Sequence, residues 1–120
     1  MATTELTIET IESTVNDNDI VLIDFWADWC GPCKRFAPIF EESSEANPEI
    51  VHAKVDTEAE QQLAAEFQIT SIPTLMAFRE GIMVFNQAGA LPSQSLAQVV
   101  DAVRALDMDD VRKQIAATQS

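Results

Sequence analysis

The sequence predicts one α/β domain in which a central mixed sheet carries helices on both faces. Short apolar, β-branched runs alternate along the chain with segments of helical periodicity, an order typical of such folds. The 120 residues are enough for one domain with a buried core and too few for two. Apolar residues make up 47% of the chain and charged residues 22%, a balance that argues against a disordered protein.

The first predicted elements are a helix and a long central strand. Thr7 is placed to cap the helix, and the polar run at 16–19 ends it. Its apolar face holds Ile8, Ile11 and Val15. The run IVLIDFW at 20–26 is apolar without alternation and is interrupted only by Asp24. Such a run predicts a strand buried on both faces, and therefore central in a largely parallel sheet.

The middle of the chain predicts a helix with an internal proline, a second strand and another helix. Helical spacing begins at Cys33, and Pro38 falls inside that helix, where a proline kinks or interrupts it. The second strand is expected over 50–55, and Thr57 is placed to cap the next helix. The buried side of that helix is expected to carry Leu63, Ala64 and Phe67.

The last third predicts a β-hairpin and two helices. Strands at 74–78 and 82–88 flank a turn in which Gly81 can take a positive φ, so we expect them to be antiparallel. The next helix presents Leu96, Val99, Val100, Val103 and Leu106. We expect residues 1–106 to form the domain and residues 107–120 to form a helical extension. The extension either docks on the domain or meets a partner, and docking is favoured. The shared apolar face of the extension carries Met108, Val111 and Ile115.

The charge and the apolar runs exclude several classes of partner. Seven basic residues stand against twenty acidic ones, for a net charge of −13, which disfavours nucleic acid and anionic membranes as main partners. No apolar run is long enough to span a bilayer, and the N-terminus lacks the pattern of a signal peptide. We therefore expect a cytoplasmic monomer, in which a permanent structural disulfide is not expected.

The only two cysteines lie in the segment FWADWCGPCK, where the central strand ends and the next helix begins. Unpaired N–H groups and the positive end of the helix dipole favour a thiolate at Cys30, and a stabilised thiolate can attack a disulfide in another molecule. Pro32 fits the first helical turn, where no N–H is needed. Gly31 permits the close approach of a substrate backbone.

Three uses of the cysteine pair fit this spacing: half of a metal site, a structural staple, or a redox dithiol. A structural zinc site needs four ligands, and the chain adds only His52 to the two cysteines, so we expect no metal. The stabilisation that a disulfide gives grows with the loop it closes, and two intervening residues gain least. Redox exchange is therefore the favoured use.

Asp24 is unusual because it interrupts an apolar strand. Burial of a carboxyl there raises its pKa and makes it a proton acceptor near neutral pH. The alternative is an aspartate that reaches water at the end of the strand. Lys54, in the second strand, is on the sequence alone a strand residue with a solvated ammonium group.

The segments DFWADWCGPCK and SIPTLMAF resemble the active-site and cis-proline segments of the thioredoxin family, and the Gly-Ala pair at 89–90 is similar to the family's as well. The resemblance covers roughly residues 5–106 and implies the thioredoxin fold. It also implies a protein-disulfide reductase and electron carrier. No bound cofactor is needed, since the electrons reside in Cys30 and Cys33. The implied partners are an NADPH-dependent thioredoxin reductase and disulfide-containing target proteins.

The resemblance assigns the chemistry to four residues. Cys30 would attack the target disulfide, and the more buried Cys33 would resolve the mixed disulfide. Asp24 would be the buried carboxyl that helps deprotonate Cys33, and Lys54 would be the lysine set near it.

The resemblance also assigns binding and support. The Ile72-Pro73 bond would be cis, although most such bonds are trans, and would pack against the dithiol. The Ile72 backbone could then pair with an extended substrate segment. Trp26 would pack beside the cysteines, and Pro38 would kink the helix. The residues that would contact substrate are Trp29, Gly31, Pro32, Ile72, Pro73 and Gly89.

Two other functions stay open at this point. One is a thioredoxin-fold scaffold whose contacts matter more than its turnover. The intact Cys-Gly-Pro-Cys motif, Asp24 and Pro73 favour the reductase, because a scaffold needs none of them. The other is an oxidase or isomerase of secreted proteins, which the N-terminal sequence disfavours. Gly-Pro between the cysteines, which in this family accompanies a reducing potential, disfavours it as well.

Overall fold

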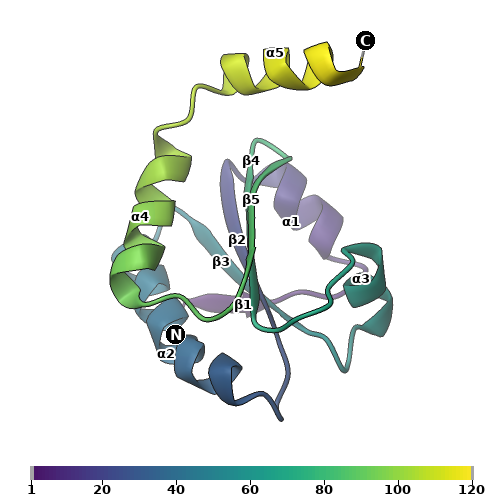
Figure 1. Ribbon diagram of the computed structural model, residues 1–120, viewed down its shortest axis with the longest axis vertical. Coiled ribbons are helices and arrows are strands. Elements are labelled where there is room, and N and C mark those ends of the chain that lie inside the picture. The colour runs from purple at the N-terminus through teal and green to yellow at the C-terminus, as the bar shows by residue number, and fades with distance from the viewer. Residues whose placement is uncertain (1, 120) are drawn as a thin grey trace.

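A mixed five-stranded sheet runs through the middle of the protein, with helices on both of its faces (Figure 1). The computed structural model describes residues 2–119. In chain order the elements are β1 (Thr3–Glu5), α1 (Ile11–Asp17), β2 (Ile20–Trp26), α2 (Gly31–Ala46), β3 (Val51–Asp56), α3 (Gln61–Glu66), β4 (Thr74–Arg79), β5 (Ile82–Ala88), α4 (Ser93–Arg104) and α5 (Met108–Gln119). The strands lie in the order β1-β3-β2-β4-β5. The predicted mixed sheet with helices on both faces is confirmed.

β2 is the middle strand of this sheet, as its apolar run predicts. It pairs in parallel with β3 and antiparallel with β4. Its residues from Ile20 to Phe25 are buried, and Trp26 is half-buried. The hairpin of β4 and β5 is antiparallel as predicted, and Gly81 in its turn has a φ of +82°.

Alternate side chains of β2 enter two separate cores. One core lies between the sheet and helices α1 and α3, and the other between the sheet and helices α2 and α4. The first takes Val21, Ile23 and Phe25 from β2. The second takes Ile20 and Leu22, together with Phe36 and Phe40 of α2. Asp24 continues the second row, so its carboxyl faces the side of the sheet that α2 covers.

Two predicted helix caps were wrong because other residues occupy the N-cap positions. The carbonyl of Thr7 accepts hydrogen bonds from the N–H groups of Thr10 and Ile11 in a preceding turn, and α1 begins only at Ile11, with Thr10 as its N-cap. Thr57 does not cap α3, whose N-cap is Glu60. β1, which pairs in parallel with β3, was not predicted at all.

Helix α2 continues through Pro38, so this proline does not interrupt it. The predicted helix after residue 106 is present as α5, which lies at the opposite end of the molecule from the junction of β2 and α2 (Figure 1). Met108 is buried, and the Arg112 guanidinium pairs with Glu80, at the turn between β4 and β5, at 2.6 Å. Within residues 2–119 we find no helix of the length and hydropathy that a membrane crossing requires.

Candidate active site

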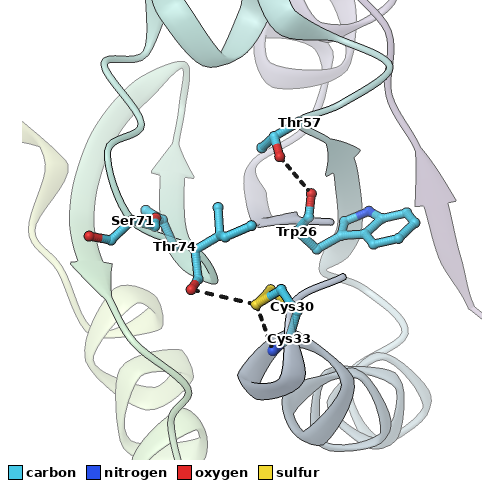
Figure 2. The surroundings of a disulfide bond; sticks show 7 residues. Trp26, Cys30, Cys33, Thr57, Ser71 and Thr74 are labelled. Carbon is cyan, nitrogen blue, oxygen red and sulfur yellow. Dashed lines mark hydrogen bonds between the residues drawn. A yellow bond between two sulfur atoms is a disulfide. The ribbon is translucent and has the colours of Figure 1, made fainter. Parts of the chain in front are cut away.

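The two cysteines form a disulfide at the N-terminus of α2 (Figure 2). Their Cα atoms are 5.2 Å apart, a usual separation for a disulfide. Cys30 is the N-cap residue of the helix, with Pro32 and Cys33 in the first turn, where a proline lacks no hydrogen bond. Both cysteines are buried, whereas Gly31 and Pro32 are exposed. The pair is therefore covered on most sides and open at one edge.

The N-terminus of α2 provides a positive environment for the sulfur of Cys30. The backbone N–H of Cys33 donates a hydrogen bond of 3.2 Å to Sγ of Cys30. The first turn of the helix contains no acidic side chain that would oppose the dipole. Once the disulfide is reduced, the same N–H and the dipole stabilise a negative charge on Cys30 more than on an ordinary surface thiol.

The loop before β4 lies against the disulfide from the other side. The Ile72-Pro73 peptide bond is cis, which confirms the geometry that the resemblance implies. The carbonyl oxygen of Ile72 is 3.6 Å from Sγ of Cys30. A disulfide sulfur carries no proton to donate, so in this state the pair is a non-bonded contact. The N–H of Gly89 donates a hydrogen bond of 2.8 Å to the carbonyl of Pro73, so the residue that follows β5 lies beside the cis-proline loop.

A surface surrounds the open edge of the disulfide. Trp29 is 69% exposed, and Ile72 is half-buried and Gly89 exposed beside the loop. The six residues assigned to substrate contact thus come from the β2–α2 junction, the cis-proline loop and the end of β5. Trp26 is half-buried, and its ring points away from the disulfide (Figure 2). Its backbone carbonyl accepts a hydrogen bond of 3.0 Å from the Thr57 hydroxyl.

A shallow hollow adjoins this surface, and the sequence did not indicate it. Trp29 and Ile72 form one wall, and residues from α3 and the segments that flank it form the other. The residues of this second wall are Thr57, Glu58, Gln61, Ala64, Ala65 and Ile69. No local pattern marks these residues, because only the packing of α3 brings them beside Trp29 and Ile72.

Asp24 is 0% exposed, which decides between the two interpretations of this residue in favour of burial. Neither carboxyl oxygen has a hydrogen-bond partner among residues 2–119. Burial raises the pKa of Asp24 to about 7, against an opposing effect of the Lys54 ammonium and with a smaller raising effect of Glu5. Asp24 can therefore hold or release a proton near neutral pH.

Lys54 lies beside Asp24 in the register of β2 and β3. It is half-buried, and its ammonium lies 4.9 Å from the centre of the Trp26 ring, a cation–π distance. The ion pairs found within residues 2–119 do not join it directly to Asp24. No group of three potential metal ligands occurs in that part of the chain.

Comparison with known proteins agrees with this geometry. The family model described as thioredoxin matches residues 2–102. The chain belongs to the thioredoxin family. A curated relative, putative thioredoxin 2 of Streptomyces coelicolor, is 56% identical over 119 residues, which cover 99% of this chain and 89% of the relative. Thioredoxin C-3 of Corynebacterium nephridii is 43% identical and covers 81% of this chain and 68% of its own length.

Solved thioredoxin structures also share the fold. A thioredoxin from Plasmodium falciparum superposes with a TM-score of 0.77 at 34% identity, over 82% of this chain and 97% of its own. A thioredoxin variant from Halobacterium salinarum gives 0.81 at 31% identity, over 88% and 93%. Thioredoxins are disulfide oxidoreductases, and this member carries the Cys-Gly-Pro-Cys pair at disulfide distance. Its activity is thiol–disulfide exchange at Cys30 and Cys33.

Proposed function

We propose that the chain is a general protein-disulfide reductase. An NADPH-dependent thioredoxin reductase reduces its disulfide, and the resulting dithiol reduces disulfides of target proteins. The observation that carries this proposal is the Cys30–Cys33 disulfide at the N-terminus of α2, beside an exposed tryptophan and an open edge. The family acts with such a reductase and such targets. The chain needs no bound cofactor, because the electrons are held by the two sulfur atoms.

The cycle begins with the reduced dithiol. The Cys30 thiolate attacks one sulfur of the target disulfide, and the other target sulfur leaves as a thiolate. Cys33 then loses its proton and attacks Sγ of Cys30, which breaks the mixed disulfide and releases the second target sulfur. Two electrons have passed to the target, and the Cys30–Cys33 disulfide described above is the oxidised product. The reductase returns the pair to the dithiol by the same exchange in reverse.

Asp24 takes the proton of Cys33 in this cycle. Its carboxyl lies on the face of the sheet that α2 covers, and α2 carries Cys33 in its first turn. A pKa of about 7 leaves a sizeable ionised fraction at neutral pH to act as base. Lys54 supports this role by favouring the ionised carboxyl.

The surface around the disulfide binds the target. Trp29, Pro32 and Gly89 supply an apolar area, and Gly31 lets the target backbone approach. The Ile72 backbone pairs with an extended segment of the target. Trp26 and Pro38 support the site from within the fold.

We assign residues 1–106 to the catalytic domain and residues 107–120 to a separate extension. The match of the family model to residues 2–102 supports this boundary. The protein acts as a monomer in the cytoplasm, where NADPH and reduced thiols keep such a carrier charged.

The test is reduction of insulin with NADPH and a bacterial thioredoxin reductase. Wild type reduces insulin and consumes NADPH, whereas Cys30→Ser gives only the rate without added protein. Cys33→Ser retains the attacking thiol but not the resolving one, so it accumulates a mixed disulfide with insulin that runs as one species on a non-reducing gel. Equal rates for wild type and Cys30→Ser would eliminate the reductase and favour a scaffold.

A further inference from the structure

A row of three charged side chains crosses the sheet on the face that α2 covers. Glu5 of β1 lies opposite Lys54 of β3, and Lys54 lies opposite Asp24 of β2. Residues paired on neighbouring strands point to the same face of a sheet, so all three side chains share the face that α2 covers. The row therefore joins the buried carboxyl to the edge strand β1.

Exposure increases along this row. Asp24 is completely buried, Lys54 is half-buried and Glu5 is exposed. One ammonium group thus stands between two carboxyl groups, one in the interior and one at the surface. A lysine side chain is long and flexible enough to favour either neighbour.

In this structure Lys54 packs against Trp26. The ammonium lies over the Trp26 ring, at 4.9 Å from its centre, and not at ion-pair distance from Asp24. The indole N–H has no hydrogen bond of ordinary geometry within residues 2–119, but it lies close enough to the Glu5 carboxyl to lower the pKa of that group. The tryptophan therefore favours the ionised form of Glu5 on the outer side of the lysine.

Few other charges face this row. Partial burial of its carboxyl raises the pKa of Glu5, and Asp56 of β3 acts in the same direction. The Lys54 ammonium and the Trp26 indole lower it, but not enough to cancel the effect of burial. On the far side of β2, the residue of β4 paired with Asp24 is the uncharged Leu75. Helix α2 contributes the cysteine pair. Within residues 2–119, the charged groups that act on Asp24 are therefore Lys54, which lowers the pKa of Asp24, and Glu5, which raises it.

We propose that Glu5 is a positioning residue of the redox centre, which competes with Asp24 for the ammonium of Lys54 and so decides how firmly the buried carboxyl holds its proton. An ionised Glu5 draws the ammonium outward and leaves Asp24 less neutralised. A neutral Glu5 lets the ammonium act on Asp24 alone. The consequence for catalysis rests on the proposed role of Asp24 as the base for Cys33.

The size of the expected pKa shift of Asp24 follows from the spacing of the strands. Glu5 and Asp24 are separated by two strand spacings, about 10 Å. A unit charge at that distance moves a pKa by roughly 0.3 to 1 unit, depending on how far water screens the pair. Removing the Glu5 charge should therefore lower the midpoint of the Asp24 titration by this amount, and more if Lys54 moves inward.

The experiment is a carbon-detected NMR titration of the Asp24 carboxyl in the oxidised protein, in which the cysteines do not titrate. The variants are Glu5→Gln and the matched control Glu12→Gln, which removes an equal charge from α1 on the opposite face of the sheet. We expect the midpoint to fall in Glu5→Gln and to stay at the wild-type value in Glu12→Gln. An unchanged midpoint in Glu5→Gln, or equal shifts in both variants, would overturn the proposal.

A second pair of variants tests whether Lys54 carries the effect. In a Lys54→Met background there is no ammonium to compete for, and only the direct effect of the Glu5 charge remains, so Glu5→Gln should shift the Asp24 midpoint by less than in wild type. Equal shifts in both backgrounds would overturn competition as the cause. The pH profile of insulin reduction is measured on the same proteins. If the NMR midpoint moves and the profile does not, Glu5 controls Asp24 as proposed and Asp24 is not the base.

Discussion

Replacing Asp24 with asparagine should make the protein more stable at alkaline pH and slower in disulfide reduction. The substitution keeps the size of the side chain and removes its charge. Burial raises the pKa of Asp24 from 3.8 to about 7, so the folded state resists ionisation of this group. A shift of this size corresponds to about 4 kcal/mol of lost folding stability once the carboxyl is ionised in both states.

The sign follows from the protons bound in each state. Below about pH 4 Asp24 is protonated in the folded and the unfolded protein, and it does not affect stability. As the pH rises toward 7, the unfolded state loses its proton first, and the free energy of unfolding falls by about 1.4 kcal/mol per pH unit. Above the folded pKa both states are ionised, and the full loss remains. The asparagine side chain of the variant does not ionise, so the variant escapes this loss.

The assay is urea denaturation of the oxidised protein at several pH values from 4 to 8.5. The difference in unfolding free energy between Asp24→Asn and wild type should grow by about 4 kcal/mol in favour of the variant across this range. Asp28→Asn serves as the matched control, because it makes the same change at an exposed residue of the β2–α2 junction. A difference that stays constant with pH for Asp24→Asn would refute the burial of an ionisable group there.

Three further predictions concern the target surface, one backbone position and the buried histidine. Trp29→Ala should raise KM for a protein disulfide about tenfold with little change in unfolding free energy. Met83→Ala, which also removes a large exposed apolar side chain, should leave KM unchanged. Gly89→Ala should lower the unfolding free energy by about 1–2 kcal/mol. The added methyl group would have no neighbour within 4 Å among residues 2–119, so the loss is backbone strain at a φ of +104°. Gly31→Ala, at a position without a positive φ, should change the unfolding free energy by less than about 0.5 kcal/mol. Burial lowers the pKa of His52, so the folded protein resists protonation of this ring. The free energy of unfolding of wild type should therefore fall as the pH falls below the unfolded pKa of the histidine. In urea titrations between about pH 7 and 5, wild type should lose stability relative to His52→Gln.

The sequence indicated the elements whose signals are local. β2 and the β4–β5 hairpin appear within a residue of their predicted bounds, because continuous apolar composition and a turn glycine mark them directly. The burial of Asp24 was also predictable, since apolar neighbours on both sides leave a strand residue no route to water. The position of Cys30 and Cys33 at a helix start follows from the change of periodicity that begins there.

The features that were missed depend on pairing between distant segments. β1 has the sequence Thr-Thr-Glu, which carries no apolar signal, and it is a strand only because β3 offers it a free edge. The row of Glu5, Lys54 and Asp24 requires the register of two parallel pairings, and no local pattern states a register. The wall that α3 contributes beside Trp29 has the same origin.

The presence of Asp24 in the central strand is best explained by chemistry and not by folding. A leucine or valine would suit both the strand and the core around Leu22, without burying a carboxyl that has no hydrogen bond within residues 2–119. The expected loss of about 4 kcal/mol above neutral pH is a large part of the 5–15 kcal/mol that holds a small domain together. A group with that effect persists where it performs a task, and proton transfer under the cysteine pair is the task its pKa suits. If Asp24→Asn proved more stable and equally fast over the whole pH range, this explanation would fail, because the residue would then reduce stability without contributing to the reaction.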